Sequence, residues 1–388
     1  MRTRYLLLTI TLLAFAFIGT VYFYNNQLAE SIKFNATPVS DEPIVSNKGL
    51  EDKDTIKILI IDGGGIRGLI PLYVLQYIED KLGKPTSEIF DVFSGVSTGA
   101  IIATGLNMPH QKDYMFKDEK AELHSKSEKI IDIYKSESEY LFSSPWYHKI
   151  LTVNGFLSPR FLGDRLHEVM QKHYSSELNF RELNNYVIIP SLDIHTGKLH
   201  LFKNRGEDSS ELPTDTLYQL VTAAAAAETL FPPVDFMSHN DDVKHRYYSD
   251  AGISANNPAS IILREIIKEF PGKKYYVLVL GAGTSPLETM EKNYRELKNW
   301  GRLNWMQDAI SNVQRSMDDQ QIYTLDIAKS LAPEGQIEFN YLNVEIIDPF
   351  VDPFDYKSID KLKILSERLI NDNKEEICHV LKHLGGET

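Results

Sequence analysis

The stretch Ile89-Phe-Asp-Val-Phe-Ser-Gly-Val-Ser-Thr-Gly-Ala-Ile-Ile-Ala-Thr104 decides the fold of this protein. Its first five residues, 89–93, are mostly apolar and predict a short buried strand. The alanine-containing apolar run at its end suits a helix. Gly95, Ser97 and Gly99 lie between the two as Gly-x-Ser-x-Gly. This pattern between a strand and a helix is typical of a nucleophile elbow.

The spacing of the elbow has a chemical reason. A serine at the tip of so sharp a turn is strained, and the residues two positions away must lack side chains that would clash. The hydroxyl then projects from the sheet, where the N-terminus of the following helix stabilises negative charge. Ser97 is therefore the candidate nucleophile. A turn of small residues in a core is the alternative interpretation.

A second strand–loop–helix unit comes earlier in the chain. Residues 56–61 predict a strand, and residues 69–82 carry a helical apolar stripe that Gly83 ends. The loop between them reads Asp62-Gly63-Gly64-Gly65-Ile66-Arg67-Gly68. We expect its glycine amides to form an anion hole beside Ser97. Arg67 is expected either to orient the loop or to add positive charge, and a solvated surface arginine is the alternative.

The same loop has an alternative interpretation as a nucleotide site. Gly63, Gly65 and Gly68 match the dinucleotide pattern G-x-G-x-x-G, with Glu79 or Asp80 as the acid that binds the ribose. That acid should end a second strand, whereas both of these residues lie within the first helix. The pattern therefore favours the anion hole.

Strands and helices alternate along the rest of the chain. The strand patterns have few polar alternations, which indicates a mostly parallel central sheet covered by helices on both faces, an α/β fold. The predicted strands are 186–192, 198–202, 274–280 and 337–347. The predicted helices are 164–174, 216–228 and 258–270, with one or two closing helices over 359–384.

The base for Ser97 is predicted to be a carboxylate. Asp250 ends a predicted strand before a turn of small residues, which is where open α/β sheets place catalytic groups. A desolvated carboxylate has a raised pKa and accepts a serine proton directly. A helix cap or Asx-turn is the alternative role. None of the candidate histidines follows a strand as a positioned base should; these are His239, His245, His379 and His383.

The charge and the cysteine and histidine content indicate which binding partners and metal sites to expect. The net charge of −13 argues against a nucleic-acid partner. Cys378 is the only cysteine, so no intrachain disulfide forms. His379 and His383 are four residues apart, but no Glu follows His379 as the H-E-x-x-H zinc motif requires. We expect neither a metal nor a cofactor.

The N-terminus predicts a membrane anchor. Residues 5–24 carry no charge, and as a helix they would cover roughly 30 Å, one hydrocarbon core. Arg2 and Arg4 precede them, which predicts a single-pass protein with its catalytic domain on the non-cytoplasmic side. A cleaved secretory signal, releasing the protein, is the alternative.

Together the motifs resemble those of the patatin-like phospholipases. Residues 62–68 are similar to the family's oxyanion loop, 95–99 to its nucleophile elbow, and 231–233 with 250–258 to the region of its catalytic aspartate. Residues 280–283 resemble a further block, so the match runs from about 56 to 283. One departure is Ala251, where the family usually has glycine; Gly252 follows it.

The resemblance implies a patatin-like fold and a serine lipid acyl hydrolase. Ser97 would be the nucleophile, Asp250 its partner in a dyad without histidine, and Gly63 to Gly65 the oxyanion hole. Phospholipids or related acyl lipids are the implied substrates, and the predicted anchor adds a membrane as an expected partner. The expected parts are a membrane segment (1–24), a linker (25–54), the catalytic domain (55–350) and a helical tail (351–388). A nucleotide-dependent oxidoreductase and a catalytically silent binding module are the alternatives.

Overall fold

The structure is a computed structural model that describes residues 2–28, 32–35, 48–109, 125–206, 212–237, 245–284, 323–324, 326–331, 333, 335–348 and 351–385. These residues form an α/β fold around a nine-stranded sheet with the order β1-β6-β7-β4-β3-β2-β8-β9, and β5 pairs with β4. The strands are β1 (Lys33–Asn35), β2 (Thr55–Ile61), β3 (Val92–Gly95), β4 (Tyr186–Asp193), β5 (Lys198–Lys203), β6 (Val234–Met237), β7 (His245–Asp250), β8 (Lys274–Leu280) and β9 (Ile337–Leu342).

The centre of the sheet is parallel, as predicted. β2 pairs in parallel with β3 and β8, β3 with β4, and β8 with β9. The pairs β4–β5, β4–β7 and β6–β7 are antiparallel. At one edge, residues 33–35 pair with β6 in parallel, so part of the predicted linker belongs to the sheet.

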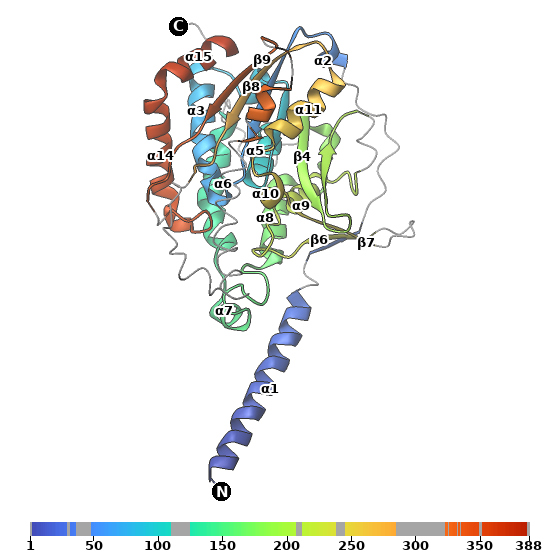
Figure 1. The fold of residues 1–388 in the computed structure, drawn as a ribbon, viewed down its shortest axis with the longest axis vertical. Helices are drawn as coiled ribbons and strands as arrows, with labels where there is room; N and C mark the ends of the chain where they lie inside the picture. Colours follow the sequence, from blue (N-terminus) through green and yellow to red (C-terminus); the bar gives the residue numbers. More distant parts are fainter. Residues whose placement is uncertain are drawn as a thin grey trace, which may run out of the picture.

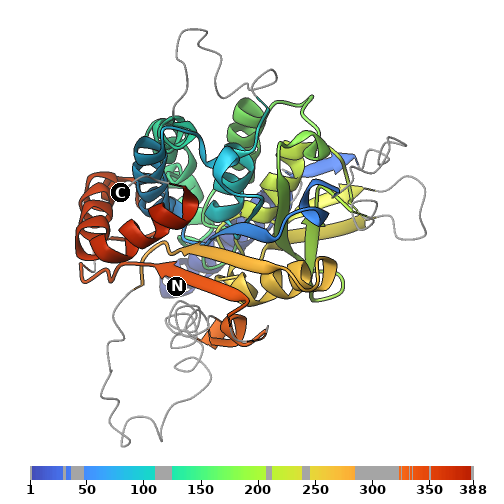
Figure 2. The same cartoon turned by 90° about the horizontal axis from the view of Figure 1, so that it is seen from above.

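Helices cover both faces of the sheet (Figures 1 and 2). Apart from α1, they are α2 (Lys48–Glu51), α3 (Leu69–Leu82), α4 (Thr86–Ile89), α5 (Thr98–Leu106), α6 (Lys126–Leu141), α7 (Trp146–Leu151), α8 (Gly163–Tyr174), α9 (Leu217–Ala225), α10 (Gly252–Ala255), α11 (Ala259–Glu269), α14 (Ile359–Asp372) and α15 (Lys374–Leu384). The predicted helix over 69–82 is confirmed by α3, which ends where Gly83 takes a left-handed φ of 64°.

Strand β2 ends in an unbroken apolar run, residues 58–61, and its place in the sheet explains this pattern. Successive strand side chains point to opposite faces of a sheet. Leu59 and Ile61 belong to the larger core cluster, on the side of α3, α5 and α9. Ile58 and Ile60 belong to the second cluster, with residues of α11. Both faces of the strand are therefore buried, as in parallel sheets generally.

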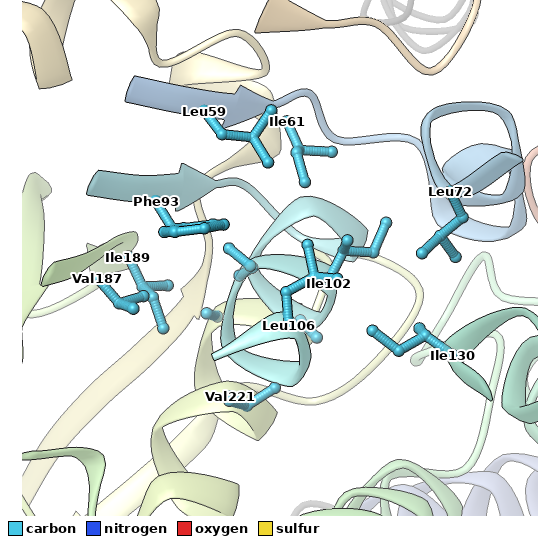
Figure 3. Close-up of a cluster of buried hydrophobic side chains, with 14 of the residues drawn as sticks. Leu59, Ile61, Leu72, Phe93, Ile102, Leu106, Ile130, Val187, Ile189 and Val221 are labelled. Carbon is cyan, nitrogen blue, oxygen red and sulfur yellow. The ribbon is translucent and has the colours of Figure 1, made fainter. Parts of the chain in front are cut away.

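Helix α5 lies at the centre of the larger cluster, directly after the elbow. Figure 3 shows its residues Ile102 and Leu106 among side chains of the neighbouring strands, such as Phe93 of β3 and Leu59 of β2. All four of these side chains are fully buried. Ser97 is thus attached to a helix and a strand that the core holds in place.

Three predicted boundaries differ from the structure by three residues or more. The strand predicted over 337–347 ends at Leu342. The strand predicted over 89–93 begins only at Val92, because pairing with β2 starts at Ile58 opposite Val92, and residues 86–89 form the short helix α4. The helix predicted over 216–228 ends at Ala225. There the carbonyl oxygen of Ala226 accepts a hydrogen bond from the Asp250 amide at 3.1 Å, which ties this end of the helix to β7.

Helix α1 (Arg2–Leu28) projects from the body of the molecule and contacts α7 (Figure 1). The Tyr24 hydroxyl lies 2.8 Å from Nδ1 of the buried His148. His148 Nε2 lies 3.0 Å from the carbonyl oxygen of Pro159 and must donate to it, so Nδ1 accepts the proton of Tyr24. This contact joins the end of α1 to the folded domain.

The prediction of a membrane-spanning helix, and with it of a single-pass protein with its catalytic domain on the non-cytoplasmic side, is wrong. Within the part of the chain that the structure describes, no helix has both the length and the apolar character needed to cross a membrane.

Candidate functional site

Ser97 lies at a strained turn between β3 and α5. Its φ of 56° and ψ of −119° are a backbone conformation that side-chain-bearing residues rarely adopt. A β carbon at Gly95 would collide with the backbone of Gly99, and one at Gly99 would collide with the carbonyl of Ile61. The two glycines of the predicted elbow are therefore required by close packing around Ser97.

Asp250 is the last residue of β7 and is buried. Its Oδ1 accepts a hydrogen bond from the Gly252 amide at 2.7 Å. Burial raises the pKa of the Asp250 carboxyl to about 7, an effect that the Ser97 hydroxyl and the Gly252 amide oppose and that the charge of Glu228 reinforces. Oδ2 is buried and makes no hydrogen bond of normal geometry with the described residues. It is the oxygen left to receive a proton.

The glycine loop follows β2 and leads through the 3₁₀ turn Gly65–Gly68 into α3. Two of its amides are already used: that of Gly63 donates to the carbonyl of Asn256 at 3.0 Å, and that of Ile66 to the carbonyl of Pro353 at 2.8 Å. The amides of Gly64 and Gly65 donate to no other residue in the described ranges. These two N–H groups can therefore bind an anion.

Asp62 and Arg67 fasten the loop to distant parts of the chain. Asp62 Oδ2 accepts a hydrogen bond from the Tyr341 hydroxyl at 3.1 Å, and that hydroxyl accepts one from Asn343 at 2.6 Å. Asn343 Oδ1 in turn accepts from the amide of Gly283 at 2.8 Å. The buried Arg67 donates from Nη2 to the carbonyl oxygen of Val351 at 2.7 Å, so this side chain connects the loop to residues 351–354.

Gly68 completes the packing between the loop and the elbow. A β carbon at Gly68 would collide with the side chain of Thr98, the first residue of α5. The Thr98 hydroxyl is hydrogen-bonded to the hydroxyl of Tyr134 on α6. The glycine loop and the elbow therefore lie side by side, as the sequence predicted.

Two adjoining cavities meet at Ser97. The first contains the polar groups of the site: Gly63, Gly64, Gly65, Arg67, Ser97, Glu228, Asp250 and Asn256 line it together. The second is mostly apolar and is lined by side chains of α5, α6 and α8, including Ile101, Ile133, Leu141, Phe142, Leu166, Val169 and Met170. Gly65, Ser97, Ala227 and Phe354 border both cavities.

No histidine of the described chain lines either cavity. His245 lies at the start of β7, with Nδ1 3.0 Å from both carboxylate oxygens of Asp235. His379 and His383 lie on α15 and contact Glu338. His239 lies outside the described residues.

Sequence reasoning missed several residues of the site. Phe354 borders both cavities, although we assigned residues 351–388 to a separate tail. Glu228 lies in the polar cavity and affects the Asp250 carboxyl. The motif Leu230-Phe-Pro-Pro233 begins two residues after Glu228 and was the available signal for it. No local pattern pointed to Phe354, because its place depends on contacts with the distant glycine loop.

The nucleotide interpretation of the loop fits the structure poorly. The carboxylate of Glu79 is fully buried and accepts hydrogen bonds from the Thr86 amide at 2.7 Å and the Ser125 hydroxyl at 2.8 Å. A ribose acid must be free to bind its ligand. The carbonyl of Pro353 also occupies the position next to Gly65 where a pyrophosphate would approach.

Comparison with known proteins agrees with this geometry. The family description "Patatin-like phospholipase" matches residues 59–263, which include the glycine loop, Ser97 and Asp250. The chain belongs to the patatin-like phospholipase family. Membership supports a lipid acyl hydrolase that acts on ester bonds, and the family accounts for the α/β architecture seen here.

Several plant proteins are among the relatives of this chain. The chain is 30% identical to patatin-like protein 2 of Arabidopsis thaliana over 68% of this chain and 70% of that protein. It is 28% identical to patatin-like protein 3 of the same plant, over 75% and 73% of the two chains. Patatin group D-3 of Solanum tuberosum is 27% identical over 76% of each. The crystal structure of VipD from Legionella pneumophila aligns with a TM-score of 0.34 and 14% identity over 89% of this chain and 73% of that one.

Proposed function

We propose that this protein hydrolyses acyl esters of phospholipids or related lipids, with Ser97 as nucleophile and Asp250 as its general base. One observation carries the proposal: a strained serine, a buried carboxylate of raised pKa and two unused amides line a single cavity. Perturbed carboxylates and free backbone donors around a nucleophile are what acyl transfer requires.

The first half-reaction forms an acyl-enzyme. Asp250 takes the proton of the Ser97 hydroxyl as the serine oxygen bonds to the ester carbonyl carbon. The carbonyl oxygen becomes an oxyanion, and the amides of Gly64 and Gly65 donate to it. Because the Gly63 amide is bonded to Asn256, we assign Gly63 a packing role in place of the donor role expected from the family. The ester bond then breaks, and Asp250 returns the proton to the departing alcohol.

The second half-reaction uses the same groups on water. Asp250 removes a proton from a water molecule, whose oxygen bonds to the acyl carbon. The bond between that carbon and Ser97 breaks, and the serine oxygen recovers the proton. The fatty acid leaves and the enzyme is restored. Each negatively charged intermediate is stabilised by the same two amides, which need no rearrangement between steps.

The apolar cavity is suited to bind the long acyl chain of the substrate. Its aliphatic and aromatic lining removes an alkyl chain from water, at about 0.8 kcal/mol for each buried CH₂. The cavity meets the polar one at Ser97, so a chain bound there has its carbonyl end beside the nucleophile. This arrangement favours lipids over small water-soluble esters.

A surface next to the apolar cavity supports contact with a lipid aggregate. The α7 region, residues 144–157, carries six exposed apolar side chains: Trp146, Tyr147, Ile150, Val153, Phe156 and Leu157. Phe142 precedes this region and lines the apolar cavity, and Phe161 follows it and packs against Phe142 and Phe231. A lipid surface in contact with 144–157 would thus lie beside the cavity wall.

Product analysis tests the chemistry. The purified full-length protein, in micelles of mixed phospholipids, should release free fatty acid and lysophospholipid that mass spectrometry identifies. Ser97→Ala should release neither. If the Ser97→Ala protein retains activity, or nucleotide co-purifies with the wild type and no lipid is cleaved, the proposal is wrong. A wild type that binds lipid vesicles without cleaving them would indicate a silent binding module.

A separate comparison tests the lipid surface. Trp146→Ser with Phe156→Ser should lower the rate on phospholipid vesicles at least tenfold while leaving the rate on a monomeric short-chain ester unchanged. Equal losses on both substrates would contradict the assigned role of residues 144–157.

A further inference from the structure

Three potential metal ligands meet at the edge of the sheet, remote from Ser97. Glu338 lies near the start of the edge strand β9, and His379 and His383 lie on the last helix, α15. Residues four apart share one face of a helix, so both imidazoles point the same way. His379 Nε2 lies 2.9 Å from Glu338 Oε1, and His383 Nε2 lies 3.2 Å from the same oxygen.

The hydrogen bond of His383 Nδ1 shows which of its two ring nitrogens carries the proton. His383 Nδ1 lies 3.1 Å from the carbonyl oxygen of His379, which can only accept a hydrogen bond. Nδ1 therefore carries the proton, and a neutral His383 directs the lone pair of Nε2 at the Glu338 carboxylate. Two electron-rich atoms 3.2 Å apart repel each other unless a positive charge lies between or beside them. Either a second proton on His383 or a cation bound by all three side chains satisfies the contact.

His383 also makes the supporting contacts that are typical of a metal ligand. A ligating histidine commonly donates its other ring nitrogen to a backbone carbonyl, which fixes the tautomer, and His383 does so. The ring of Tyr276 stacks on the ring of His383 with centroids 5.5 Å apart and planes 11° from parallel. The orientation of His383 is thus fixed on two sides.

We propose that Glu338, His379 and His383 bind a divalent transition-metal ion, with Zn²⁺ the ion that the donors suit best. Their candidate ligand atoms all lie within 4.8 Å of one another. In a tetrahedral zinc site with bonds of about 2.0–2.1 Å, ligand atoms are roughly 3.3 Å apart, close to the 2.9 and 3.2 Å found here. Two imidazoles and one carboxylate leave the fourth position for water.

The site joins the C-terminal helix to the edge of the sheet. None of its three residues lines a cavity that contains Ser97. Toward the other end of β9, the Tyr341 hydroxyl donates to Asp62 of the glycine loop and accepts from Asn343. A bound ion therefore stabilises the packing of α15 on β9 and takes no part in ester hydrolysis. We expected no metal from the sequence because no local zinc motif is present. The third ligand here, Glu338, is 41 residues from His379, so a local motif cannot contain it.

Calorimetry with the full-length protein, stripped of metal by a chelator, tests the site with ZnCl₂ as the titrant. Binding at a stoichiometry of one should raise the unfolding temperature. His379→Ala and His383→Ala should each weaken binding at least tenfold, and Glu338→Gln should weaken it while keeping the shape of the side chain. His195→Ala, which removes a histidine from an exposed turn, is the matched control and should bind zinc as the wild type does.

Cobalt gives an independent measurement of geometry. Co²⁺ bound to the wild type should give the strong visible absorption of a four-coordinate ion, and His379→Ala should lose it. Fatty-acid release should be the same with and without metal and in both histidine variants. Absence of zinc binding, or binding that survives the loss of both histidines, would overturn the metal site. A loss of fatty-acid release on metal removal would overturn its structural role.

Discussion

Nη2 of Arg67 donates a hydrogen bond to the carbonyl oxygen of Val351 at 2.7 Å, although 284 positions separate these residues in the chain. Two residues further on, the carbonyl of Pro353 accepts from the amide of Ile66 at 2.8 Å. The glycine loop is thus held between β2, which precedes it, and a segment near the C-terminus. The position of the Gly64 and Gly65 amides depends on both.

Arg67→Ala should therefore lower kcat at least tenfold while KM changes little. The substitution leaves the buried Val351 carbonyl without its donor, at a cost of about 1–3 kcal/mol, and lets the loop move. Arg67→Lys should recover only part of the rate, because lysine keeps the charge but lacks the planar guanidinium. Steady-state kinetics with a soluble ester measures both. Arg264→Ala, at an exposed arginine, is the control, and a loss of equal size there would contradict the explanation.

The oxyanion donors can be tested through the packing of Gly64. A β carbon at this position would lie 2.5 Å from the β carbon of Ala282. Gly64→Ala should therefore displace the loop amides and lower kcat by about a hundredfold, the usual effect of losing one oxyanion donor. Adding Ala282→Gly removes the colliding atom and should restore most of the rate.

Lipid binding should stay nearly constant in both Gly64 variants, because the amides act mainly on the oxyanion that forms in the transition state. Vesicle co-sedimentation measures it. A single variant that loses binding and rate in proportion would indicate that the loop binds a ground-state ligand.

Ser97 and Asp250 should behave as one unit. Ser97→Ala and Asp250→Asn should each remove nearly all ester hydrolysis, and the double variant should be scarcely slower than either, as for residues that act in the same step. Changing His239, His245, His379 or His383 to Gln, one at a time, should keep the rate within a few fold. A folded histidine variant with a thousandfold loss would replace the dyad with a histidine-containing triad.

The pH dependence follows from the raised pKa of Asp250. The base must be ionised to accept a proton, so kcat/KM should rise with pH through about 7 and level off above it. Glu228→Gln removes a negative charge that disfavours this ionisation, so the rising limb should move to lower pH. The shift should be modest, because burial is the largest cause of the raised pKa and is unchanged.

Temperature distinguishes the carboxylate from a histidine in the same pH profile. Ionisation of a carboxyl group has a small enthalpy and that of an imidazolium a large one. The rising limb should therefore hardly move between cold and warm assays. A strong temperature dependence, or a limb that Glu228→Gln shifts to higher pH, would contradict Asp250 as the titrating base.

The sequence by itself determined the local parts of this protein. Apolar periodicity and Gly83 located α3 over 69–82, and the unbroken apolar run over 58–61 in β2 indicated a sheet buried on both faces. The order of the glycine loop, the elbow at Ser97 and the strand end at Asp250 identified the family. These features could be read because each depends on residues within a few positions of one another.

Only the tertiary structure decided the features that depend on distant contacts. In the folded chain the Gly63 amide donates to the carbonyl of Asn256, and Pro353 and Phe354 lie against the glycine loop. Glu338 lies beside the two histidines of α15. The tertiary structure also set where β3 begins, because strand ends follow from pairing with a neighbour. Hydrogen bonds between segments far apart in the chain leave no periodic trace in the sequence, since only folding brings their partners together.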